Sequence, residues 1–139
     1  METKSIQQTI FFAGSPDRVY RILTDSELHS EMTGSPAKIG KLEGEAFEAW
    51  DGYILGQNTC LNPGKLIVQL WQADEEDWPK NHFSKVTIWL KEVEGGTQLD
   101  FFQEDVPASL VEHITLGWEN FYWKSLHQML AGENDDIDE

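Results

Sequence analysis

The apolar residues of this chain repeat with two different periods. Over residues 5–12 and again over 36–103, apolar and polar residues mostly alternate, which is typical of strands with one buried face. After Pro107 the apolar residues recur at helical spacing, which predicts one long amphipathic helix that runs to about Ala131. Gly132 is expected to end this helix.

Shorter signals complete the order of elements. Ser15 is a typical N-cap for a helix after the first strand, and a second short helix is expected over residues 26–32, ended by Gly34. Tight turns are predicted at residues 62–64 and 94–96.

These elements predict an α+β domain in which a curved antiparallel sheet wraps around the C-terminal helix, with two short helices after the first strand. We expect a single domain over residues 1–132 and an acidic, disordered tail over residues 133–139. A bent sheet that diverges from the helix would leave an apolar hollow, which is the natural place for a ligand.

The charge balance narrows the range of partners. Lys and Arg total 10 against 25 Asp and Glu, which gives a formal net charge of -15. Such a surface repels nucleic acid and anionic membranes, and it favours a basic protein patch or a cationic ligand. Alternatively, the acidity serves only to keep the protein soluble. Because no signal peptide is visible and Cys60 is the only cysteine, we expect a cytoplasmic protein.

A set of short segments carries a family resemblance. The segments are Asp51-Gly52-Tyr53-Ile54, Trp71, Trp78-Pro79-Lys80-Asn81-His82-Phe83, Val86-Thr87-Ile88, Gly96-Thr97-Gln98-Leu99, Val106-Pro107 and Gly117-Trp118 with Tyr122. In this order they resemble the C-terminal-type domain of the activator of Hsp90 ATPase, within the Bet v 1-like, START-related (SRPBCC) superfamily. The resemblance covers about residues 5–131.

The resemblance implies a helix-grip fold with an internal cavity. It leaves activity open, because the superfamily contains lipid and hormone binders, cyclases and chaperone partners. Eukaryotic activators also carry an N-terminal module that docks on the chaperone. This chain begins at the first predicted strand, so we expect an activator-like domain that lacks this module.

Catalytic and metal-binding motifs are not visible in the sequence. The four histidines do not have the spacing of a metal site, and the acidic run at residues 74–77 lacks the pattern of a calcium loop. We therefore expect no catalytic residue, no metal and no cofactor, and interpret residues 74–77 as a solvated loop, with weak cation binding as the alternative. A cyclase or hydrolase would require a polar cluster inside the cavity.

Aromatic residues on the inner faces are the candidates for the lining of the cavity. The residues expected to line it are Phe47, Asp51, Trp71, Ile88, Leu99, Phe101, Ile114, Trp118, Phe121, Tyr122 and Ser125. Core packing alone would also explain the apolar members. Asp51 either faces the cavity or caps a turn, and Ser125 either orients a ligand or bonds back to its own helix. Gln103 is a further candidate for orienting a ligand, and Trp123 is expected on the polar side of the helix.

Two functional hypotheses follow. The first is a non-enzymatic binding domain that holds a small hydrophobic or amphipathic ligand between the sheet and the helix. The alternative is a chaperone-associated interaction factor of the Hsp90 type, whose acidic surface would dock on a basic patch. The sequence leaves open whether the protein is a monomer or a homodimer.

Overall fold

The structure, a computed structural model, describes residues 1–137. Its elements in chain order are β1 (Thr3–Phe12), α1 (Pro16–Thr24), α2 (Ser26–Thr33), β2 (Lys38–Ile39), β3 (Ala46–Ala49), β4 (Ile54–Asn62), β5 (Leu66–Ala73), β6 (Ser84–Val93), β7 (Gly96–Pro107), η1 (Ala108–Leu110), α3 (Val111–Gly117), η2 (Trp118–Trp123) and α4 (Lys124–Ile137).

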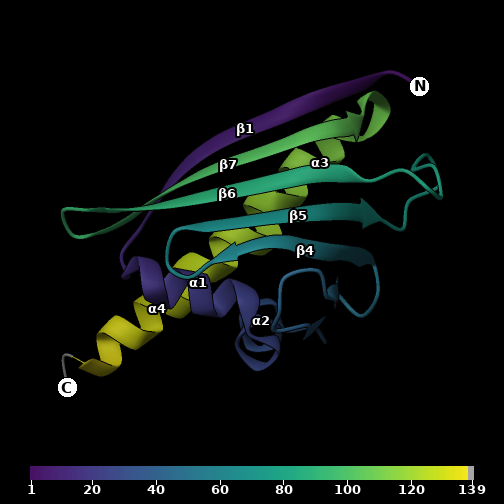
Figure 1. Ribbon diagram of the computed structural model, residues 1–139. Coiled ribbons are helices and arrows are strands. Elements are labelled where there is room, and N and C mark those ends of the chain that lie inside the picture. Colours follow the sequence, from purple (N-terminus) through teal and green to yellow (C-terminus); the bar gives the residue numbers. More distant parts are fainter. Residues whose placement is uncertain (138–139) are drawn as a thin grey trace.

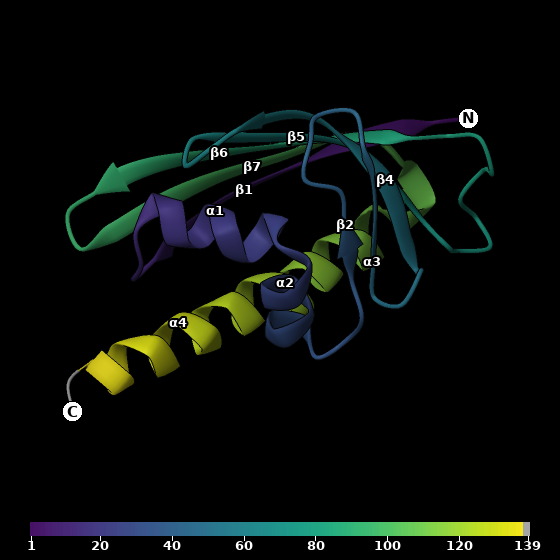
Figure 2. The ribbon, with the colours of Figure 1, turned by 60° about the horizontal axis from the view of Figure 1, so that its bottom comes forward.

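The strands form one antiparallel sheet in the order β1-β7-β6-β5-β4-β3-β2. The sheet is curved, and the C-terminal helix crosses beneath it (Figure 1). Figure 2 shows α1 and α2 on the same face as the C-terminal helix, so one face of the sheet is covered. The predicted α+β architecture, with the sheet wrapped around a long terminal helix, is confirmed.

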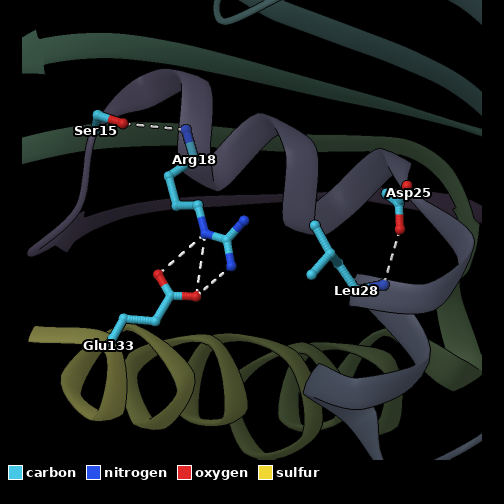
Figure 3. A network of polar contacts seen from close by, with 5 residues as sticks. All are labelled: Ser15, Arg18, Asp25, Leu28 and Glu133. Atoms are coloured by element: carbon cyan, nitrogen blue, oxygen red, sulfur yellow. Dashed lines mark hydrogen bonds and ion pairs between the residues drawn. The ribbon is translucent and has the colours of Figure 1, made fainter. Parts of the chain in front are cut away.

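The two short helices begin and end where the sequence predicts. The Ser15 side chain accepts a hydrogen bond from the backbone N–H of Arg18, and the Asp25 side chain accepts one from the N–H of Leu28 (Figure 3). These bonds satisfy backbone donors that the first helical turn leaves unpaired. Gly34 ends α2 in the left-handed conformation, with φ of 76°.

The long C-terminal helix contains a π-helical turn, η2, between α3 and α4. A π turn holds one more residue than the same stretch of α-helix, so the buried stripe shifts by one position after Trp118. Trp123, Leu126 and Leu130 are buried, whereas Ser125 and Met129, which an unbroken α-helix would point inward, are only half-buried. The prediction that Trp123 lies on the polar side is therefore wrong.

The helix also continues beyond its predicted end. Gly132 lies inside α4, which runs to Ile137, so the expected stop at Gly132 is wrong. Glu133, the first residue of the predicted tail, forms an ion pair with Arg18 of α1 through its carboxylate (Figure 3). The last two residues of the predicted tail, 138 and 139, lie outside the described residues.

The core fills the space between the concave face of the sheet and the helices. Its largest fully buried side chains include Phe12, Phe101 and Leu126, which come from the sheet and from α4. Within residues 1–137, no helix is long and apolar enough to cross a membrane.

Candidate functional site

An apolar pocket of about 480 Å³ opens at one end of the sheet, and we call it the end pocket. It lies between α3 and η2 on one side and the β3–β4 turn and the β5–β6 loop on the other. In Figure 1 this is the end of the sheet near α3, away from the C-terminus. The volume is within the range of pockets that hold small organic ligands.

Six aromatic rings surround the end pocket and form what we call the aromatic wall. They are Trp50, Tyr53, Trp71, Trp118, Phe121 and Tyr122. The rings brace one another: the centroids of Trp118 and Tyr122 are 4.5 Å apart, and those of Trp50 and Phe121 are 5.6 Å apart. Mutual packing of this kind fixes the shape of the wall before any ligand binds.

The β3–β4 turn places two members of the wall. Trp50, Asp51 and Gly52 have positive φ angles of 54°, 55° and 89°. Consecutive left-handed residues turn the chain sharply, which ends β3 at Ala49 and brings Trp50 and Tyr53 to the end pocket. Two of these residues are not glycine, so the surrounding structure must hold the turn at some cost in free energy.

A polar cluster lies at the rim of the end pocket, and we call it the rim cluster. Glu75 accepts a 2.7 Å hydrogen bond from the hydroxyl of Tyr53, and its same oxygen, Oε1, lies 2.7 Å from Nε2 of His113. The hydrogen bond from Tyr53 is the main reason why the pKa of Glu75 is lowered. Burial, followed by the bond to Glu75, raises the pKa of Tyr53. The cluster thus presents an ionised carboxylate beside an apolar cavity.

Behind the wall, a buried chain of hydrogen bonds holds Trp118 in place. Its indole Nε1–H donates to Oε1 of Gln103 at 2.8 Å, and Nε2 of Gln103 donates to the Ser84 hydroxyl at 2.9 Å. The Ser84 hydroxyl in turn donates to the backbone carbonyl of Trp71. Gln103 is therefore fully engaged in the core and does not orient a ligand, contrary to the prediction.

The deep interior between sheet and helix is almost filled. A void of only about 20 Å³ remains there, and its lining includes Phe47, Ile88 and His29 as well as Trp71, Trp118 and Tyr122, which also border the end pocket. His29 is buried, its Nδ1 has no hydrogen-bond partner among the described residues, and burial lowers its pKa to about 4. A space of this size holds at most about one water molecule. The cavity therefore opens at the end of the fold and not at its centre.

The structure brings together about half of the predicted lining. Trp71, Ile114, Trp118, Phe121 and Tyr122 border the end pocket. Trp118 is buried, whereas Phe121 is 57% exposed at the mouth.

The other predicted residues lie elsewhere. Phe47 and Ile88 border only the small void, and Leu99 and Phe101 are packed in the core. Asp51 was predicted to face the cavity or cap a turn. It is exposed on the β3–β4 turn, because the strand that would have pointed it inward ends at Ala49.

Ser125 is half-buried on α4 and borders neither the end pocket nor the small void. The π turn explains this, because it moves Leu126 into the buried stripe in place of Ser125.

The rim cluster was missed by sequence reasoning. Glu75 belongs to the acidic run that looks like a solvated loop, and His113 was weighed only as a metal ligand. Their contact joins residues 38 positions apart, and nothing in local spacing reports such a contact. Tyr53, one residue before β4, carries the one signal in the sequence, because a tyrosine combines an apolar ring with a hydroxyl that usually finds a hydrogen-bond partner when buried.

Fold and pocket together define a helix-grip domain whose apolar cavity opens at one end of the sheet. A family model described as "Activator of Hsp90 ATPase homolog 1-like protein" matches residues 13–131. The chain therefore belongs to this family, as the sequence resemblance indicated.

Two relatives illustrate the match in sequence. The activator of 90 kDa heat shock protein ATPase homolog 1 from Homo sapiens is 32% identical over 117 residues, which cover 84% of this chain and 34% of that protein. The corresponding activator homolog from Dictyostelium discoideum is 31% identical over 119 residues, covering 84% of this chain and 30% of that protein. The chain thus spans about a third of the length of these relatives.

Two solved structures share the fold. A crystal structure of an Hsp90 activator from Plasmodium falciparum superposes with a TM-score of 0.84 at 24% identity and covers 91% of this chain and 96% of that one. The solution structure of the Aha1 dimer from Colwellia psychrerythraea superposes with a TM-score of 0.77 at 20% identity, with the same coverage of both chains. At these identities the likeness establishes the helix-grip fold alone.

Proposed function

We propose that this domain binds a small hydrophobic or amphipathic ligand in the end pocket, without covalent chemistry. The observation that carries the proposal is the pocket itself, about 480 Å³ bordered by six aromatic rings. Large rings offer contact area at little cost in conformational entropy, and the wall is already assembled in the free protein.

The position of the polar groups supports binding over catalysis. The rim cluster lies at the mouth of the pocket, and the His113 side chain is 61% exposed. Groups that transfer protons in enzymes usually work in a site from which water is excluded. The rim cluster is therefore better placed to orient a ligand than to transfer protons. It would contact the polar end of a ligand whose apolar part lies against the aromatic wall.

Gly117 provides a direct test. It borders the end pocket, and a Cβ added there would meet nothing within 4 Å, so a side chain can begin there in open space. We expect Gly117→Leu to keep the fold and to reduce binding of the neutral dye N-phenyl-1-naphthylamine at least about tenfold, because leucine occupies the ligand volume. Dye fluorescence measures binding, and circular dichroism checks the fold.

Gly132→Leu is the matched control. Gly132 is also helical and also has free space around it, but it does not border the end pocket. Equal dye binding by wild type and Gly117→Leu would contradict the proposal, as would native mass spectrometry of fresh protein and a dye titration that both show nothing bound.

A chaperone-associated role is the second candidate. It is supported by membership of the family and by the 32% identity with the human activator homolog. The net charge of -15 suits docking on a basic patch, and such binding should weaken as salt rises. Titration with Hsp90 at about 50 and 300 mM salt, together with its ATPase rate, tests this role. The chaperone-associated role is contradicted if binding is absent at both salt concentrations and the ATPase rate is unchanged.

A further inference from the structure

We infer that the end pocket selects organic cations: an ammonium group beside Glu75, carried on an apolar body that lies against the aromatic wall. This inference rests on the proposed function and names the class of ligand. Three independent features of the pocket support it, namely a carboxylate with one free oxygen, the arrangement of the rings, and the charge around the mouth.

The first feature is the carboxylate of Glu75. Its contacts with the Tyr53 hydroxyl and with Nε2 of His113 both involve Oε1. Oε2 has no partner among the described residues and is not among the buried unpaired atoms, so it is open to solvent at the mouth of the pocket. Only 26% of the Glu75 side chain is exposed. A partly desolvated anion attracts a cation more strongly than a fully hydrated one does.

The second feature is the aromatic wall. The plane of Trp50 is inclined by 69° to that of Phe121 and by 75° to that of Tyr122. Because these planes are steeply inclined, the wall offers ring faces in more than one direction. The face of an aromatic ring carries partial negative charge and attracts ammonium groups, most strongly when the group is shielded from water.

The third feature is the charge around the mouth. The residues that border the pocket include no Lys and no Arg among those that the structure describes. The loop that carries Glu75 also carries Asp74, Glu76 and Asp77, all exposed. An acidic field over an apolar cleft raises the local concentration of cations and repels anions. We therefore expect an anionic amphiphile such as a fatty acid to bind weakly in the end pocket.

Three probes with a phenylalkyl body and a cationic, a neutral or an anionic head group test the inference. They are 4-phenylbutylamine, 4-phenylbutanol and 4-phenylbutanoate, whose shared phenylalkyl body fits the apolar part of the pocket. Binding is measured by displacement of N-phenyl-1-naphthylamine at pH 8. We expect the amine to bind about tenfold or more tightly than the alcohol, and the acid to bind most weakly.

Glu75→Gln and Glu76→Gln form the matched pair of variants. Both remove one negative charge from the same loop, but only Glu75 borders the pocket. We expect Glu75→Gln to reduce the preference for the amine over the alcohol to about threefold or less, with binding of the alcohol retained. Glu76→Gln should change the preference much less than Glu75→Gln does, because its exposed charge lies outside the pocket and is only one of several near the mouth.

Each outcome decides between the claims. Equal binding of amine and alcohol to the wild type overturns the cation selectivity and leaves the proposed function standing. An equal loss of preference in both variants assigns the selectivity to the general acidic field and overturns the role of Glu75. Failure of the dye and of all three probes overturns the proposed function together with this inference.

Discussion

The two ends of the C-terminal helix lie under the same sheet, yet side chains pack closely against one end and an apolar pocket opens beside the other. At the closed end, Phe12 and Leu126 are fully buried, and a Cβ added to Gly14 would come within 2.8 Å of Leu130. At the open end, Trp118 and Phe121 border a pocket of about 480 Å³. The same helix therefore borders a closely packed core at one end and a pocket at the other.

The course of the backbone explains why the two ends of the helix differ in packing. At the closed end, α1 follows β1 directly and covers the core, and Arg18 of α1 holds Glu133 of α4. At the open end, the left-handed turn at residues 50–52 joins β3 to β4, and the π turn η2 widens the helix. These two irregular segments border the end pocket, which agrees with the tendency of π turns to occur at functional sites.

Trp118 contacts residues of both the end pocket and the core, so its truncation should lower the free energy of unfolding the most. Trp118→Ala removes ring contacts to Trp71, Phe101, Tyr122 and Trp123 and leaves Gln103 without its donor. We expect the free energy of unfolding to fall by about 3–5 kcal/mol, measured by urea denaturation. Trp89→Ala, where the side chain is 49% exposed, is the control and should cost less than about 1 kcal/mol. Similar losses in both variants would contradict this account.

A pair of truncations compares the two ends directly. Leu126→Ala, at the closed end, should cost about 2–5 kcal/mol because the residue is fully buried and leaves a cavity. Phe121→Ala, at the open end, should cost less than about 1 kcal/mol because its ring is 57% exposed, but it should weaken dye binding severalfold. If Leu126→Ala weakens dye binding more than Phe121→Ala does, the ligand site is not at the open end.

His29, beside the small void, should make stability depend on pH. Burial lowers its pKa to about 4, below its ordinary value, so the native state favours the neutral imidazole. The resulting stability is fully present above about pH 6.5 and is lost as the pH falls toward about 4, because the unfolded chain takes up a proton first. At about 1.4 kcal/mol per pKa unit, the contribution is about 3 kcal/mol.

His29→Gln isolates this contribution from that of the carboxylates. We expect the difference in unfolding free energy between pH 7 and pH 4.5 to be smaller in this variant than in wild type, whereas His82→Gln, at a partly exposed site, should leave the difference unchanged. An identical pH dependence in wild type and His29→Gln would show that His29 is not buried in the neutral form.

Loss of the ion pair at the closed end should change the free energy of unfolding the least. Arg18 and Glu133 are 31% and 30% exposed, so solvent screens their attraction, and Glu133→Gln should cost less than about 1 kcal/mol. Hydrogen exchange is the more sensitive measurement: amides near Glu133 should lose protection, while Glu112→Gln on α3 should not change them. Unchanged exchange in Glu133→Gln would show that the pair does not hold the end of α4.

The regular parts of the fold were predictable because they follow from local rules. Ser15 and Gly34 mark helix ends through their own side-chain and backbone chemistry, and alternation along the strands reports which face is buried. The family followed from ordered motifs such as Gly117-Trp118. The end of the last helix was not predictable from Gly132, because its continuation depends on a partner, Arg18, that is distant in sequence.

Of the residues at the site, only apolar ones on the C-terminal helix and the sheet could be predicted from the sequence. Ile114, Trp118 and Tyr122 share a helical face, so their convergence follows from spacing. Ser125 and Asp51 do not border the end pocket, because a regular element that would have pointed each of them inward gives way to an irregular segment, η2 in one case and the β3–β4 turn in the other. Glu75 and His113 meet only through the tertiary fold, which the spacing of residues along the chain does not encode.

The π turn also has a consequence for how relatives should be aligned with this chain. Deleting the exposed Asn120 would restore ordinary α-helical spacing between Trp118 and the buried Trp123, while Phe121 would be carried around the helix axis. The closed-end positions Leu126 and Leu130 would keep their phase relative to Trp123. A one-residue gap at this place in a relative therefore reports a change in its pocket and not a loss of its core.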